Sequence, residues 1–132
     1  MTAMNPSEVV WLLHSILRCQ RQGQGATLRD VIAFADYTNH AILTFREFSA
    51  GLASLTGLNL VHKVDGLLLA NSSLMLKLPS FWEREKPDYE AERQWLAAYL
   101  ATLAPTAALP SIDTTEAEFK AAVTAYVTGE SN

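Results

Sequence analysis

The side chains best suited to catalysis or metal binding are widely separated along this 132-residue chain. The three histidines, His14, His40 and His62, lack the spacing of a helical metal motif, and no carboxylate falls at a matching offset. The single cysteine, Cys19, lies in an apolar helical stretch without an activating neighbour, so we expect a packing or neutral role. The sequence has no Gly-x-Ser-x-Gly, no phosphate-cradling glycine loop and no Cys-x-x-Cys. We therefore expect no enzyme activity, no cofactor and no metal.

Acidic residues concentrate in the C-terminal part of the chain, whose formal net charge is −4. Residues 1–78 carry six basic and five acidic side chains, whereas residues 79–132 carry four basic and nine acidic. Nucleic-acid binders usually show a basic excess on one face, and neither part of this chain shows an obvious one. An acidic run comprises Glu83, Glu85, Asp88, Glu90 and Glu92, with Arg84, Lys86 and Arg93 interleaved. It is either a solvated face or a docking surface for a basic partner.

The composition predicts one soluble domain. Apolar residues make up 49% of the chain and charged residues 18%, which is typical of a folded protein. Residues 1–7 are polar and lack the features of a signal peptide, and the longest apolar runs are too short to span a bilayer. We therefore expect a cytoplasmic protein without a membrane partner. The aromatic residues near Trp82 and Trp95 are expected to pack in the core or at a dimer interface, in preference to lining a pocket.

Three helices are expected in the first half of the chain. Apolar residues recur at helical spacing from Val9 to a helix end near residues 20–22. Thr27 can cap a second helix, and residues 36–40 are turn-prone, with Asn39 a candidate for the left-handed conformation. A capping box from Thr44 to Glu47 opens a third helix, for which Gly57 is well placed as the C-terminal stop.

A β-hairpin and further helices complete the expected elements. Two short apolar strands surround Asp65-Gly66, a dipeptide suited to a type I′ turn. Gly51 inside the third helix would be explained by a close approach of another helix. Asp88 is expected to cap one later helix, and Thr115 with Glu118 forms the capping box of another. Residues between these two helices, around Pro105 and Pro110, read as an irregular linker, and residues 129–132 should fray.

Residues 27–70 resemble the winged helix-turn-helix domains of transcriptional regulators. The likeness lies in the helix–turn–helix order, in the string from Leu52 to Val61, which looks like a recognition helix running into a wing strand, and in the Asp65-Gly66 hairpin. With the first helix added, it covers about residues 8–71. The resemblance implies an α+β, mostly helical domain in which residues 72–132 form a C-terminal helical extension that packs back on the core or forms a dimer interface.

The resemblance implies a small DNA-binding transcriptional regulator, since the third helix of such domains enters the major groove and the wing touches phosphate or the minor groove. The implied contacts with double-stranded DNA are Arg29, Thr44, Arg46, Ser49, Ser54 and Lys63. Many regulators of this kind dimerise through added helices, so a homodimer is expected. The third helix carries one basic residue beside Glu47, which is few for a DNA binder. The alternative is a winged-helix module that binds another protein and no DNA.

Overall fold

A computed structural model describes residues 6–20, 24–103 and 114–129. The elements in chain order are α1 (Pro6–Cys19), α2 (Leu28–Asn39), α3 (Phe45–Gly57), β1 (Val61–Val64), β2 (Leu67–Ala70), α4 (Ser72–Lys77), the short 3-10 helix η1 (Ser80–Glu83), α5 (Tyr89–Ala101) and α6 (Glu116–Thr128). The α+β, mostly helical class predicted from the sequence is confirmed. The expected linker around Pro105 and Pro110 and the fraying of residues 130–132 lie outside the described residues.

Local sequence signals set the starts of the helices. Thr44 and Thr115 each accept a hydrogen bond from the backbone three residues on, while Glu47 and Glu118 accept from the Thr backbone in return. Both predicted capping boxes are therefore confirmed. These reciprocal bonds satisfy backbone N–H groups that the first turn of a helix leaves without partners. Thr27 caps α2 in the simpler way, with its hydroxyl accepting from the backbone N–H of Asp30.

The hairpin has the predicted turn. Asp65 and Gly66 have positive φ values of 52° and 79°, as a type I′ turn requires. The strands pair antiparallel from Val61 opposite Ala70 to Val64 opposite Leu67. Ala26, just before α2, adds a single-residue bridge to Leu68 through backbone hydrogen bonds of 2.7 and 2.9 Å. The hairpin is therefore tied to the α1–α2 connection as well as to the end of α3.

Two helix ends differ from the sequence prediction. The turn expected at residues 36–40 starts only at His40, because α2 continues to Asn39, and the left-handed residue is His40, with φ 54°, and not Asn39. A tertiary contact supports this last turn, since Asp36 accepts a 2.6 Å hydrogen bond from the Tyr126 hydroxyl of α6. Helix α3 does end at Gly57, but the positive φ follows at Asn59, with φ 61°, so Gly57 is not the left-handed stop.

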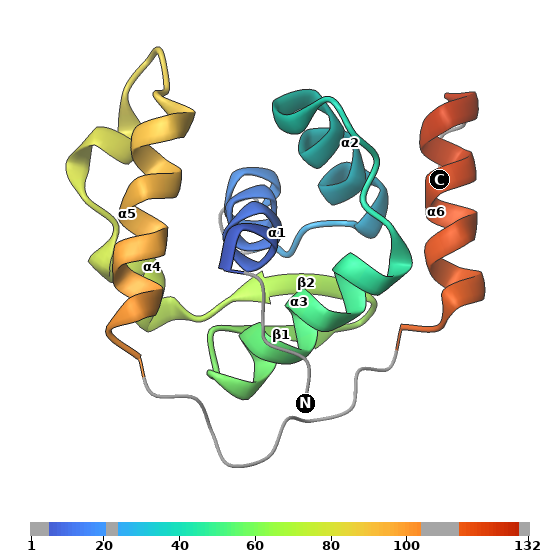
Figure 1. The fold of residues 1–132 in the computed structure, drawn as a ribbon, viewed down its shortest axis with the longest axis horizontal. Coiled ribbons are helices and arrows are strands. Elements are labelled where there is room, and N and C mark those ends of the chain that lie inside the picture. The colour runs from blue at the N-terminus through green and yellow to red at the C-terminus, as the bar shows by residue number, and fades with distance from the viewer. Residues whose placement is uncertain (1–5, 21–23, 104–113, 130–132) are drawn as a thin grey trace.

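Helix α1 forms the centre of the molecule (Figure 1). The view places α5 on one side of it, α2 and then α6 on the other, and the hairpin and α3 beneath. Gly51 explains how closely α3 packs on α1, because a Cβ at this position would lie 3.0 Å from the Leu12 Cδ2. The close helix approach predicted there is confirmed. Of the described helices, none has both the length and the apolar character needed to cross a bilayer.

Candidate functional site

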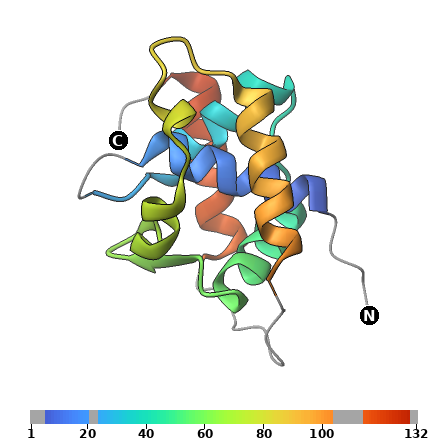
Figure 2. The ribbon, with the colours of Figure 1, turned by 90° about the vertical axis from the view of Figure 1, so that its left-hand side faces the viewer.

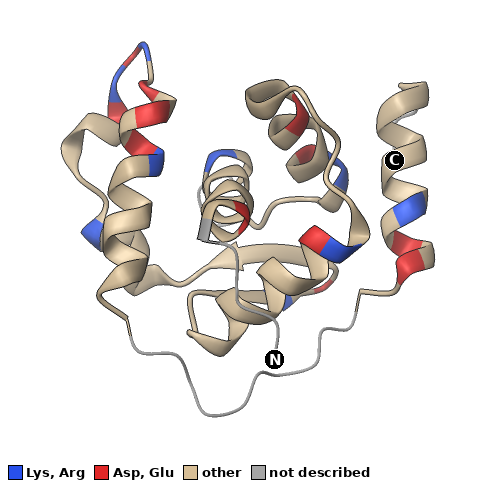
Figure 3. Cartoon of the chain, in the orientation of Figure 1, with Lys and Arg blue, Asp and Glu red and all other residues tan. Residues whose placement is uncertain are grey.

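The outward side of α3, where groove contacts are expected, offers few polar groups. Arg46 is exposed in its first turn, and Ala50 is exposed one turn later. The Thr44 hydroxyl accepts from the Glu47 backbone at 3.1 Å and belongs to the capping box. The hydroxyl of Ser49 donates to the Arg46 carbonyl at 3.3 Å. Arg46 is therefore the one cation that α3 presents, with the Glu47 carboxylate next to it in sequence (Figure 3).

Ser54 lies on the buried side of α3 and not on the exposed side, where the expected DNA contact would require it. The residue is only 7% exposed, and its hydroxyl donates to the Ala50 carbonyl at 3.0 Å. The buried side of α3 is broad, because Gly51, Leu52 and Leu55 are buried as well. Because so much of α3 is buried, only a narrow strip of the helix faces outward, and Ser54 lies outside that strip.

Lys63 and Arg29, the cations expected to anchor phosphates, both line a cavity between the hairpin, the start of α2 and α6. We call it the hairpin–α6 cavity; its volume is about 390 Å³. The Lys63 ammonium donates to the Thr114 hydroxyl at 2.9 Å and lies 3.9 Å from the Glu118 carboxylate. Its side chain is 18% exposed. The structure therefore places these two cations together, and apart from the outward strip of α3.

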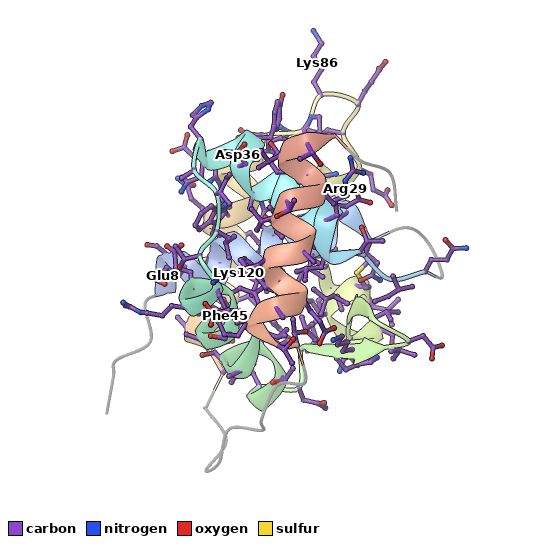
Figure 4. All side chains as sticks on the ribbon, turned by 90° about the vertical axis from the view of Figure 1, so that its right-hand side faces the viewer. Glu8, Arg29, Asp36, Phe45, Lys86 and Lys120 are labelled. Carbon is purple, nitrogen blue, oxygen red and sulfur yellow. The ribbon has the colours of Figure 1, made fainter. Side chains whose placement is uncertain are left out.

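Helix α6 packs along α2 and over the start of α3. Phe119 is buried against Phe45 and Phe48, with ring centroids 5.8 and 5.2 Å apart. Near the other end of α6, the Tyr126 hydroxyl bonds Asp36. Figure 4 shows α6 facing the viewer, with Phe45 and Arg29 on opposite sides of it and Asp36 near its upper end. The predicted return of the C-terminal extension onto the core is therefore seen for α6.

Helix α5 is fastened to α1 by a buried ion cluster of His14, Arg18 and Glu92. His14 and Glu92 are fully buried, and the His14 Nε2 lies 2.8 Å from a Glu92 carboxylate oxygen. Arg18 donates to both oxygens of the same carboxylate, from its Nε at 2.9 Å and from a terminal nitrogen. It also donates to the Trp82 carbonyl at 3.1 Å. Figure 2 shows α5 crossing in front of α1.

Aromatic rings enclose the buried ion cluster. The His14 ring makes edge contacts with Phe34, Trp82 and Tyr89 at centroid distances of 5.4, 6.0 and 5.4 Å. The Arg18 guanidinium lies 5.3 Å from the Trp82 ring and 5.6 Å from that of Tyr89. Burial is the main cause that lowers the pKa of His14, although the hydrogen bond and the charge of Glu92 act in the opposite direction. A neutral His14 that donates from Nε2 to Glu92 fits this environment.

The buried ion cluster corrects two interpretations of the sequence. Glu92 was expected in a solvated face or a docking surface, and both are wrong for this residue. His14, which seemed too isolated for any site, has two ionisable partners. A usable signal was present, because Glu92 shares a helical face with Leu96 and Tyr99, and His14 lies one turn before Arg18. Aromatic rings cover the ionisable groups of the cluster, so its role is to hold α5 in one position.

The other members of the acidic run do reach the surface. Glu83, Glu85, Asp88 and Glu90 are exposed. Trp82 is buried and packs against Trp95, so the aromatic residues of this region pack in the core.

Neither the cysteine nor a metal-ligand cluster supplies a reactive centre in the described ranges. The Cys19 thiol donates to the Asp30 carbonyl, and burial raises its pKa to about 12, so it stays protonated at neutral pH. Within residues 6–20, 24–103 and 114–129, no three His, Cys, Asp or Glu side chains gather closely enough to hold a metal ion. Comparisons with protein-family models, with curated proteins and with solved structures found no match to this chain.

Proposed function

We propose that this chain is a winged-helix protein that binds another protein and does not bind DNA. The order of α1, α2, α3 and the hairpin supports the winged-helix assignment of residues 8–71. So does the isolated bridge from Ala26 to Leu68, which ties the chain just before α2 to the hairpin.

One observation carries the choice between protein and DNA as the partner. Arg29 and Lys63, two of the three cations expected to contact DNA, line the hairpin–α6 cavity together. Turning Lys63 outward toward a phosphate would break its contacts with Thr114 and Glu118 on the α6 side. A duplex carries one negative charge per about 1.7 Å of its axis, and binding depends on Lys and Arg side chains that replace its counterions. Arg46 alone is a weak substitute for such a set.

The exposed acidic residues indicate the kind of partner. Glu83, Glu85, Asp88 and Glu90 surround the start of α5, where Arg84, Lys86 and Arg93 are interleaved with them. Figure 3 shows this acidic region on the side of the molecule away from α6. Complementary charge mainly speeds association and selects partners. A partner with a basic surface therefore fits this module.

The second candidate is the DNA-binding regulator, and the exposed position of Arg46 in the first turn of α3 favours it. A homodimer would double the number of such contacts. Since α5 and α6 bury Leu96 and Phe119 within their own chain, a dimer would have to use the other faces of these helices or a different surface. Two copies of α3 about 34 Å apart would match successive half-sites on one face of a duplex.

The test compares the purified wild-type chain with two charge-reversal variants, Glu83→Lys combined with Glu85→Lys, and Arg46→Glu. We expect no retention of labelled duplex at about 50 mM salt, where electrostatic binding is strong. We also expect a cross-linked protein partner that the Glu83/Glu85 variant loses and the Arg46 variant keeps. Retention of duplex that weakens steeply with salt and disappears in Arg46→Glu would contradict the proposal and support the regulator.

A further inference from the structure

The hairpin–α6 cavity combines apolar walls with charged side chains from three separate elements. Leu28, Phe48 and Leu68 contribute apolar surface, and Arg29, Lys63 and Glu118 contribute the charges. Its volume of about 390 Å³ lies within the range of small-molecule sites, which are typically apolar with a few polar groups that fix the ligand.

Arg29 has a donor that needs an acceptor. Its Nε is buried, and no hydrogen-bond partner reaches that atom from the part of the chain that the structure describes. A buried donor on a charged group is costly to leave without a partner. Guanidinium groups bind carboxylates and phosphates through paired N–H donors, which a hydroxyl or carbonyl cannot match. The guanidinium that carries this donor belongs to a residue that lines the cavity, so an anion is the ligand that suits this residue best.

The local charge also favours an anion. Two cations, Arg29 and Lys63, line the cavity against the single carboxylate of Glu118. The Glu118 side chain is about half exposed, so solvent screens its repulsion. The cavity also reaches Thr27 at the start of α2, and the N-terminal end of a helix carries partial positive charge. Three sources of positive potential therefore surround a space with apolar walls.

We propose that the hairpin–α6 cavity binds a small organic anion, a carboxylate or phosphate ester with a compact apolar body. The anionic group pairs with Arg29 and approaches Lys63, and the apolar body contacts Phe48 and Leu68. Such a ligand joins the hairpin, α2 and α6, which meet at this cavity. This site is independent of the partner surface at the start of α5, so either proposal can fail without the other.

Calorimetric titration tests the site with three probes: phenyl phosphate, benzoate and the neutral benzyl alcohol. We expect at least one of the two anions to bind with a Kd at least tenfold below that of benzyl alcohol. Arg29→Gln should weaken that binding at least tenfold, because it removes the paired donors. Ala121→Phe should abolish it, because Ala121 lines the cavity and is exposed, so the larger ring fills the space without entering the core. Arg46→Gln should bind like the wild type, because it removes a cation that lies outside the cavity.

Three results would overturn the proposal. One is that neither anion binds more tightly than benzyl alcohol. Another is that Arg29→Gln and Ala121→Phe, both shown by circular dichroism to be folded, bind the anions like the wild-type chain. The third is that Arg46→Gln weakens binding as much as Arg29→Gln, which would indicate a general response to surface charge.

Discussion

Replacing Glu92 with Gln should destabilise the fold strongly, although the two side chains have nearly the same shape. The Glu92 carboxylate is fully buried and accepts from three donors: the His14 Nε2, the Arg18 Nε and a terminal Arg18 nitrogen. A glutamine has one acceptor oxygen, so its NH₂ group must face at least one of these donors. The substitution also leaves the Arg18 guanidinium, whose side chain is only 18% exposed, without its counter-charge.

The expected loss is about 3 kcal/mol in the free energy of unfolding. Removing one partner of a buried ion pair costs roughly 3–5 kcal/mol, since the remaining charge stays desolvated. The lower end applies because Arg18 keeps its bond to the Trp82 carbonyl and its contacts with two aromatic rings. Domains of this size have about 5–15 kcal/mol of stability, so the variant should still fold at low temperature.

Urea denaturation followed by circular dichroism measures this loss. Glu90→Gln is the matched control, because Glu90 lies on the same helix but is exposed, and it should change stability by no more than about 0.5 kcal/mol. Removing both charges in Arg18→Met with Glu92→Leu should cost less than Glu92→Gln alone, since no unpaired charge stays buried. A loss below about 1 kcal/mol for Glu92→Gln, or equal losses at positions 90 and 92, would refute the reasoning.

Two further predictions concern the faces of α1. Burial lowers the pKa of His14 in the folded chain, so as the pH falls the imidazole is protonated first in the unfolded chain. The free energy of unfolding should therefore decline below about pH 6.5, with a slope of at most about 1.4 kcal/mol per pH unit. Urea titrations between pH 7.5 and 5 should show this decline in the wild-type chain and not in His14→Gln. The same pH dependence in both chains would count against the role of His14. Gly51→Leu should destabilise the protein by about 1–3 kcal/mol, because even a Cβ there lies 3.0 Å from Leu12. Ala50→Leu, exposed on the same helix, should stay within about 0.5 kcal/mol, and equal melting temperatures for the two variants would contradict the close packing.

Local interactions are the part of this fold that the sequence predicts well. The capping boxes at Thr44 and Thr115 and the turn at Asp65-Gly66 involve residues at most three positions apart, so their chemistry can be read directly. The predictions are wrong where residues far apart in the sequence determine the local structure. The last turn of α2 is helical with Asp36 bonded to Tyr126, 90 residues away in sequence. Ser54 is buried because α3 packs on more than one neighbour, which its own periodicity does not reveal.

The same limit applies to charge. Glu92 belongs to an acidic run in the sequence but neutralises Arg18 in the core, and the two residues lie 74 positions apart. Because the two charges pair with each other, and Glu92 is fully buried while the Arg18 side chain is only 18% exposed, the pair adds little to a basic or an acidic face.

The position of α6 links the choice of partner to the stability of the fold. If a duplex displaced α6 from the side of the cavity to reach Arg29 and Lys63 together, the fold would lose contacts that α6 makes. That movement would expose Phe119, which is 3% exposed and packs on Phe45 and Phe48, at a cost of about 1.5–3 kcal/mol for this side chain alone. The hydrogen bond between Tyr126 and Asp36 would be lost as well. In that case DNA contacts made by so few cations would first have to offset this cost, whereas the protein partner that we propose at the start of α5 would not require α6 to move.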